Sequence, residues 1–235
     1  DLPAMLETTL EMLAHRAEEK GIELILDLDP NLPAKVYSDP GRLRQVLVNL
    51  IGNAIKFTDK GEVSLTAHSC GIQDSSENIE FIIKDTGIGI DKEKLSLIFE
   101  KFTQADGTTT RRFGGTGLGL SISKLLIELM GGSLSAESEL NKGSTFTCNI
   151  LVERHTKTAE ADPVIKAALA GMNVLVVDDS QTNLFILERM LQSWNIKTET
   201  STSGRDALQK LEKRALKNEP VPLVLLDMQM PEMDG

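Results

Sequence analysis

The sequence predicts an α+β domain followed by a shorter α/β segment, and two patterns indicate this. Over residues 1–152, amphipathic helical stretches are interspersed with strands in which apolar and polar residues alternate. Over residues 172–235, short continuous apolar runs alternate with helical patterns, which is typical of βαβ units around a buried parallel sheet. Between the two parts, the polar and then Ala-rich residues 153–171 predict a linker.

The elements of the first part follow from periodicity and from turn signals. Apolar residues recur at helical spacing over residues 2–20, and Gly21 ends this helix. Ser38-Asp39-Pro40 begins a second helix, with a capping candidate and an early proline. This helix runs through RLRQVLVNLIGNAIKF and stops near Asp59-Lys60-Gly61. A third helical pattern is SISKLLIELM. Strands are expected at residues 22–30, 62–70, 76–84, 132–138 and 143–151.

The second part reads as βαβαβ. An apolar strand is expected at residues 172–177 and two more follow the helical patterns. The helices are expected at about 181–193 and 204–216, and the later strands at 196–201 and 222–227.

Bulk composition narrows the class of protein. The 235 residues have 40% hydrophobic content, as in ordinary globular proteins, and a net charge of -10 disfavours general nucleic-acid binding. Cys70 and Cys148 have no metal-ligand spacing, so we expect two reduced thiols and a cytoplasmic setting. The chain opens on Asp1 without a Met, so we expect a fragment of a longer protein, which could itself be anchored in the cell membrane.

The stretch RFGGTGLGL, residues 112–120, is rich in glycine. It fits neither the dinucleotide fingerprint nor the Walker A loop. Because Gly117 and Gly119 precede a helix and Arg111 and Arg112 stand beside them, phosphate binding is one interpretation. A glycine-rich turn without a ligand is the other, and this loop alone does not separate them.

Three other stretches favour the phosphate interpretation. In NLIGNAIKF, Asn49 and Asn53 share a helix face, which suits either an oxygen ligand for Mg²⁺ or an exposed polar stripe. In DTGIGI, Asp85 ends a strand and could accept a hydrogen bond from an exocyclic amine, or it could form an Asx turn. IFEKF, residues 98–102, is interpreted first as a core anchor.

In this order, the motifs resemble those of the ATP-binding domain of sensor histidine kinases, in the superfamily shared with gyrase, the Hsp90 chaperone and MutL. NLIGNAIKFT is similar to the N box, DTGIGI to the G1 box, IFEKF to the F box, FGGTGLGL to the G2 box and KGSTF to the final glycine-threonine element. The resemblance covers roughly residues 2–152 and implies an α+β two-layer sandwich.

The resemblance implies roles for individual residues. Asn53 would bind Mg²⁺, Asn49 would lie beside the phosphates of ATP, and Lys56 would neutralise phosphate charge. Asp85 would read the adenine amine, and Arg111 or Arg112 would reach the γ-phosphate. The remaining nucleotide-binding residues are Phe57 and Thr145 at the base, Gly87 and Gly89 along the purine, and the lid residues Gly115, Thr116, Gly117, Leu118 and Gly119.

The position of Asn49 bears on the reaction. In the water-hydrolysing members of the superfamily, a Glu four residues before the Mg²⁺-binding Asn acts as general base. Asn49 cannot take a proton there. The sequence therefore predicts ATP binding without rapid hydrolysis.

The second part carries carboxylates at strand ends. Asp178 and Asp179 follow one predicted parallel strand and Asp227 follows another, so they should meet at one sheet edge and require a divalent cation such as Mg²⁺. One Asp pair alone would suggest turn chemistry. The segment resembles a flavodoxin-like response-regulator receiver, which implies Asp227 as phospho-acceptor and Asp178, Asp179 and the Gln229 carbonyl as metal ligands.

Together these features predict part of a hybrid sensor histidine kinase. The γ-phosphoryl of ATP would pass to a His in a dimerisation domain outside this chain, then to Asp227, and onward to a phosphotransfer protein or response regulator. His15, His68 and His155 match no acceptor motif, and the chain stops at Gly235 before the last two receiver strands, so we expect the fragment alone to be inactive. The alternatives are an ATPase or chaperone-like member of the superfamily and a non-catalytic nucleotide-binding scaffold.

Overall fold

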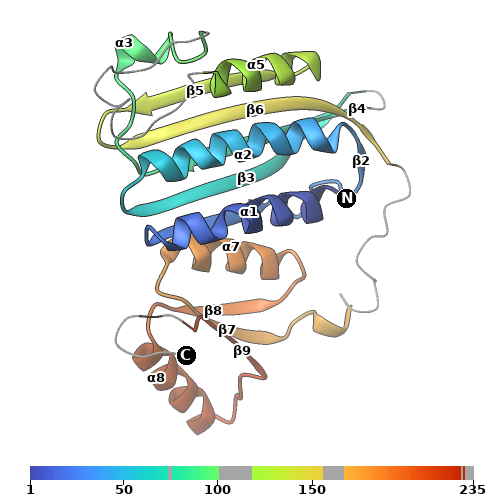
Figure 1. Cartoon of the computed structure of the whole chain (residues 1–235). Coiled ribbons are helices and arrows are strands. Elements are labelled where there is room, and N and C mark those ends of the chain that lie inside the picture. Colours follow the sequence, from blue (N-terminus) through green and yellow to red (C-terminus); the bar gives the residue numbers. More distant parts are fainter. Residues whose placement is uncertain (74–75, 101–117, 156–166, 229, 231–235) are drawn as a thin grey trace. The chain divides into compact units, whose positions relative to one another are not determined.

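The computed structural model describes residues 1–73, 76–100, 118–155, 167–228 and 230. The chain forms two compact units, Asp1–Thr158 and Ala159–Gly235 (Figure 1). In the part of the chain that the structure describes, no helix combines the length and the apolar content needed to cross a bilayer.

The first unit is built on one mixed sheet with the strand order β1-β3-β4-β6-β2, and β5 pairs with β6. β1 and β3 run parallel, whereas the other pairs are antiparallel. The strands are β1 (Ile22–Leu28), β2 (Val36–Tyr37), β3 (Gly61–Gln73), β4 (Ser76–Asp85), β5 (Ser133–Glu139) and β6 (Gly143–Arg154).

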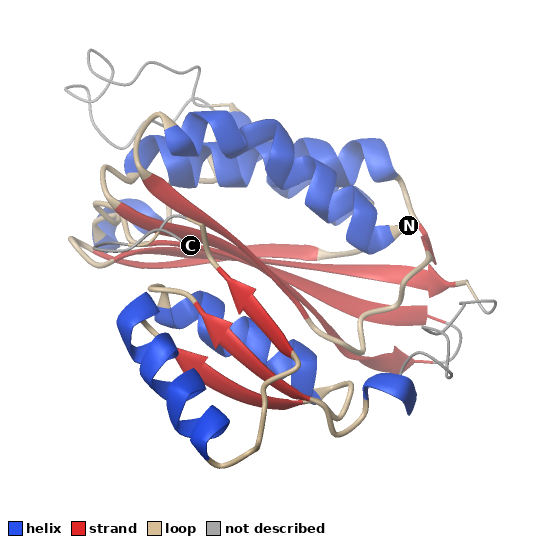
Figure 2. Cartoon of the chain, turned by 90° about the horizontal axis from the view of Figure 1, so that it is seen from below, coloured by secondary structure: helices blue, strands red, loops and turns tan. Residues whose placement is uncertain are grey.

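Helices of the first unit cover one face of this sheet (Figure 2). They are α1 (Leu2–Glu18), α2 (Pro40–Phe57), the short α3 (Lys92–Leu95) and α5 (Gly119–Leu129). α2 begins where the sequence predicts, because the Asp39 side chain accepts the Arg42 N–H at 3.0 Å. Leucines and isoleucines of α1 and α2 pack on inward-facing residues such as Phe81 of β4. The predicted α+β domain with a helix layer over a sheet is confirmed.

One lysine holds the end of α2. Lys20 follows α1, and its ammonium group donates hydrogen bonds to the carbonyl oxygens of Ile55, Lys56 and Thr58, at 2.7, 2.9 and 2.9 Å. The last carbonyls of a helix have no partner within the helix and carry its negative dipole end, so a cation is favourable there. The contact fixes the end of α2 against the end of α1.

The second unit has three parallel strands in the order β8-β7-β9. Val174 and Val176 on one face of β7 pack with residues of α7, whereas Leu175 and Val177 on the other face pack with residues of α8. The predicted α/β segment is thus confirmed. Its elements are β7 (Asn173–Val177), α7 (Gln181–Gln192), β8 (Lys197–Ser201), α8 (Gly204–Leu216) and β9 (Leu223–Leu226).

The differences from the sequence expectation lie at short elements and at strand ends. β2 and α3 were not predicted, because elements of two and four residues show no periodicity. β6 extends to Arg154, beyond the expected end at 151, because Arg154 pairs with Val36 of β2.

We predict that Lys20→Met lowers the unfolding free energy of the first unit by about 1 kcal/mol, because three helix-end carbonyls lose a charged donor that solvent partly screens. Urea unfolding followed by far-UV circular dichroism measures this change. Lys60 is also an exposed lysine, and Lys60→Met is the matched control. This variant should have the same unfolding free energy as the wild type. An equal shift in both variants would contradict the role given to Lys20.

Candidate functional site

A buried carboxylate lies at the end of β4. Asp85 is 5% exposed, and its Oδ1 accepts hydrogen bonds from the backbone N–H groups of Gly87 at 2.9 Å and Ser144 at 3.2 Å. Desolvation raises the pKa of Asp85, and the hydrogen bonds from Gly87 and Ser144 oppose this rise. The two N–H groups therefore hold one oxygen of a carboxyl group that is short of water.

The direction of this pKa shift has a consequence for stability. When the pKa of a carboxyl group is higher in the folded state, its favourable contribution is complete below the unfolded pKa and is lost as the pH rises through the folded pKa. Ionisation of the Asp85 carboxyl group therefore costs more free energy in the folded chain than in the unfolded one. A residue kept at such a cost is a candidate for function.

The glycines that follow Asp85 permit close backbone contacts. A Cβ on Gly87 would collide with the carbonyl oxygen of Phe57, and one on Gly89 would collide with that of Glu139. Gly89 also has a φ of +67°, which side chains rarely adopt. The Phe57 carbonyl accepts the Ile88 N–H at 3.2 Å, so the loop lies against the end of α2.

One face of α2 lines a cleft of about 610 Å³. Asn49, Asn53 and Lys56, three of the residues singled out from the sequence, lie together on this face. Lys56 Nζ also lies 4.9 Å from the ring centroid of Phe57, which ends the helix. The other residues lining the cleft are Met12 and Arg16 of α1 and Gly41, Arg44, Gln45, Val48 and Gly52 of α2.

Asn49 connects α2 to α5. Its Nδ2 donates a hydrogen bond to Ser123 Oγ at 2.9 Å. Gly119, the first residue of α5, lies so close that a Cβ there would collide with Asn49 Oδ1. Leu118, directly before Gly119, is half-buried at the beginning of the helix. The amide of Asn49 therefore positions the helix that follows the glycine-rich stretch.

The structure separates Thr145 from Asp85. In the antiparallel pairing of β4 and β6, Asp85 lies opposite Ser144, and Thr145 lies opposite Lys84. Because side chains alternate along a strand, Thr145 belongs to the face of the sheet away from Asp85. Ser144, which the sequence analysis did not single out, is the residue of this element that contacts the carboxylate.

Several expected site residues lie outside the described residues. These are Arg111, Arg112, Gly115, Thr116 and Gly117 of the glycine-rich stretch, and Gln229 of the second unit. In IFEKF, Ile98 is buried and Phe99 packs against the core, as expected of an anchor.

The second unit brings three carboxylates together. Carboxylate oxygens of Asp178, Asp179 and Asp227 all lie within 4.8 Å of one another. Asp178 is buried, and its Oδ1 accepts the Ser180 N–H at 2.8 Å. Desolvation raises the pKa of Asp178, and the charges of Asp227 and Asp179 raise it further. An oxygen-only set with this mutual repulsion fits a hard divalent cation.

The comparisons with known proteins agree with two domains. The model of the histidine kinase-, DNA gyrase B-, and HSP90-like ATPase matches residues 38–154, and the model of the response regulator receiver domain matches residues 174–235.

Individual relatives carry both regions. The chain is 40% identical over 222 residues to the autoinducer 2 sensor kinase/phosphatase LuxQ of Vibrio vulnificus, covering 92% of this chain and 25% of that protein. It is 37% identical over 234 residues to the sensor histidine kinase AruS of Pseudomonas aeruginosa, covering 100% of this chain and 23% of that protein. The chain thus spans about a quarter of the length of these relatives.

A solved structure is similar as well. Full-length ShkA, crystallised in complex with AMPPNP, matches with a TM-score of 0.71 and 28% identity, over 96% of this chain and 53% of that one.

Proposed function

The chain belongs to the histidine kinase-, DNA gyrase B-, and HSP90-like ATPases in its first unit and to the response regulator receivers in its second, and on this premise we propose that it is the catalytic part of a hybrid sensor histidine kinase. The first unit would bind ATP with Mg²⁺. The γ-phosphoryl would pass to a His in a dimerisation domain outside this chain and then to Asp227. The setting would be the cytoplasm, where ATP is available.

The observation that carries the proposal is the buried Asp85 carboxylate. Backbone N–H groups of Gly87 and Ser144 bind its Oδ1, and the Ser144 hydroxyl also contacts the carboxylate. A carboxylate oxygen has two lone pairs, so Oδ2 would accept the exocyclic amine of adenine. Guanine presents a carbonyl oxygen in place of that amine, and two acceptors facing each other would repel. Gly87 and Gly89 lack the side chains that would widen this loop. The site therefore supports a preference for adenine.

The residues on α2 fit the charged end of the nucleotide. Asn53 offers an amide oxygen of the kind that Mg²⁺ accepts, and Lys56 brings a positive charge to the same cleft. When bound, Mg²⁺ would neutralise phosphate charge. We propose that Asn49 lies beside the phosphates of ATP. Arg111 or Arg112 would reach the γ-phosphate, and the glycines 115, 117 and 119 would belong to the lid over the phosphates.

The side chain at position 49 favours transfer over hydrolysis. A general base for water must accept a proton, and an amide does not. Asn49 instead uses its N–H group to hold Ser123. Without a base that activates water, the γ-phosphoryl is preserved for the acceptor His.

The receiver half supports the second transfer. The Asp227 carboxylate would attack the phosphorus held by the phosphohistidine, forming an O–P bond as the N–P bond breaks and the imidazole leaves. Asp178 and Asp179 lie close enough to share a Mg²⁺ with Asp227, and charge neutralisation is most of what such a transfer needs from a protein. A downstream phosphotransfer protein or response regulator would then receive the phosphoryl group.

We predict that Asp85→Asn weakens ATP binding by about 1.5–3 kcal/mol, roughly 10- to 150-fold in Kd, because an amide N–H₂ would face the adenine amine. The unfolding free energy at pH 7 should not fall, since Oδ1 of Asn still accepts from Gly87 and Ser144 and no buried charge remains. Titration calorimetry and urea unfolding measure the two quantities.

The exposed Asp59→Asn is the matched control, with the same loss of charge outside the site. It should bind ATP as the wild type does. Equal ATP affinity in all three proteins, or equal affinity of the wild type for ATP and GTP, would remove Asp85 from the role of adenine reader.

We predict that the chain alone turns over ATP at well below about 1 per second, a modest enzyme rate. Phosphate release measured with Mg²⁺ and excess ATP tests this. A faster rate would favour the ATPase alternative. ATP binding together with labelling of a separately supplied dimerisation domain from radioactive ATP would favour the kinase, and binding without any labelling would favour a nucleotide-binding scaffold.

We predict that Mg²⁺ stabilises the second unit through Asp227. Trp194 is the only tryptophan and lies in this unit, so its fluorescence follows the unfolding of the unit. Mg²⁺ at ten times its Kd should add about 1.4 kcal/mol. Asp227→Asn should be more stable than the wild type without Mg²⁺, because one like charge is gone, and should respond less to Mg²⁺. The exposed Glu219→Gln should respond as the wild type does, and an undiminished response in Asp227→Asn would refute the site.

A further inference from the structure

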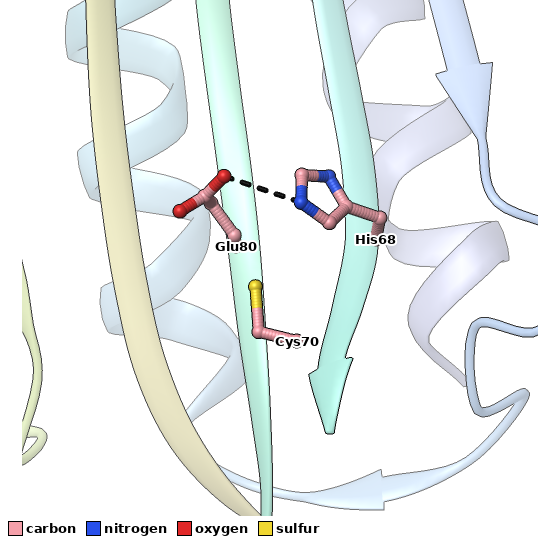
Figure 3. A group of neighbouring side chains, drawn as sticks. All are labelled: His68, Cys70 and Glu80. Carbon is pink, nitrogen blue, oxygen red and sulfur yellow. Dashed lines mark ion pairs between the residues drawn. The ribbon is translucent and has the colours of Figure 1, made fainter.

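A second group of potential metal ligands lies on the sheet of the first unit, and neither domain family accounts for it in this chain. His68 and Cys70 come from β3 and Glu80 from β4, and a nitrogen, a sulfur and a carboxylate oxygen from them all lie within 4.8 Å of one another. Figure 3 shows the His68 ring and the Glu80 carboxylate turned toward each other, with the Cys70 sulfur on the same side.

The strand register brings this group together beside a β-bulge. His68 and Glu80 are direct partners in the antiparallel pairing of β3 and β4. The register then shifts between Ser69 and Ile72, and Gly71 within the bulge has a φ of +117°. A bulge re-aims the side chains next to it. Cys70 lies next to the bulge, two residues after His68, and its sulfur is within 4.8 Å of the His68 and Glu80 ligand atoms.

This face is the opposite one from the candidate nucleotide site. Side chains of β4 alternate between buried and half-buried, with Phe81 and Asp85 on the buried face and Glu80 on the other. His68 and Glu80 are 32% and 23% exposed, and Cys70 is exposed. An ion from solution can therefore reach all three side chains without any movement of the core.

We propose that His68, Cys70 and Glu80 form a binding site for Zn²⁺, with solvent as the fourth ligand. Imidazole, thiolate and carboxylate are the three donor types that Zn²⁺ takes from proteins. A sulfur donor excludes Mg²⁺ and Ca²⁺ as preferred occupants. One thiolate and one carboxylate also balance the charge of the ion.

The distances suit the ion. Ligand atoms at the usual bond lengths around a tetrahedral Zn²⁺ are about 3.3–3.8 Å apart. The distance from His68 Nε2 to Glu80 Oε2 is already 3.2 Å. Only side-chain rotations are then needed to bring the Cys70 sulfur from within 4.8 Å to bonding geometry. The metal would join the bulged end of β3 to β4.

Coordination has one cost. Desolvation and then the charge of Glu80 raise the pKa of the Cys70 thiol, so at neutral pH this thiol carries a proton. Binding of Zn²⁺ would replace that proton. The ion pair of His68 with Glu80 would be exchanged for two metal bonds.

Cobalt titration of the whole reduced chain tests the proposal, because Co²⁺ bound to a thiolate absorbs in the near ultraviolet and in tetrahedral geometry also absorbs strongly in the visible. We expect one equivalent of Co²⁺ to give both bands, Zn²⁺ to displace it, and excess Mg²⁺ to leave it in place. Cys70→Ser should abolish the near-ultraviolet band. His68→Gln and Glu80→Gln should each weaken binding at least tenfold, since even a lost outer-shell partner costs about 10- to 100-fold.

Two variants are matched controls. Cys148→Ala removes the other thiol, which is buried, and His15→Gln removes a histidine that pairs with Glu19 on the exposed side of α1. Both should bind Co²⁺ as the wild type does. No thiolate band in the wild type, or a band that survives in Cys70→Ser, would overturn the proposal. Circular dichroism of each variant shows whether it is folded, so a lost band in a folded variant reports on the ligand itself.

Discussion

The first unit depends on one buried carboxylate. Asp85 joins three segments that are far apart in the sequence, because its Oδ1 binds the loop at Gly87 and the beginning of β6 at Ser144, and its loop lies against the end of α2 at Phe57. Burying a carboxylate without such hydrogen-bond partners would destabilise the fold strongly. The geometry around it is therefore fixed: Gly143, with a φ of +104°, has no room for a Cβ because the Asp85 carbonyl is there.

This constraint accounts for the position of the cleft. α2 must end where its last carbonyls can meet the Asp85 loop, and Lys20 holds that end in place. Once the end of the helix is fixed, its 3.6-residue period sets Asn49, Asn53 and Lys56 on one face. The proposed adenine reader and the proposed phosphate-side groups are thus positioned by the same helix terminus. Desolvation makes ionisation of the buried Asp85 carboxyl group less favourable, and the hydrogen bonds from Gly87 and Ser144 offset part of this effect.

The helices and several site residues can be predicted from the sequence. Contacts between side chains on neighbouring strands cannot, because they depend on the strand register. Long periodic helices and the carboxylates of the second unit were predictable, because parallel strands end at one edge. The choice between Ser144 and Thr145 depends on a single step of strand pairing, which periodicity alone does not give. The same holds for His68 and Glu80, which meet because the register of β3 and β4 makes them direct partners. The two residues of β2 are too few to show a period.

Asn49 shows how one substitution can serve both structure and chemistry. A carboxylate at this position has no N–H group to donate to Ser123 and would bring a negative charge to the cleft that also holds Lys56. The amide donates to the helix that follows the glycine-rich stretch, and Gly119 leaves room for its oxygen. The group that would activate water is thereby replaced by one that links α2 to α5 over 74 residues of sequence. In the proposed function, the same side chain would both preserve the phosphoryl group for an acceptor and hold the helix that follows the glycine-rich stretch.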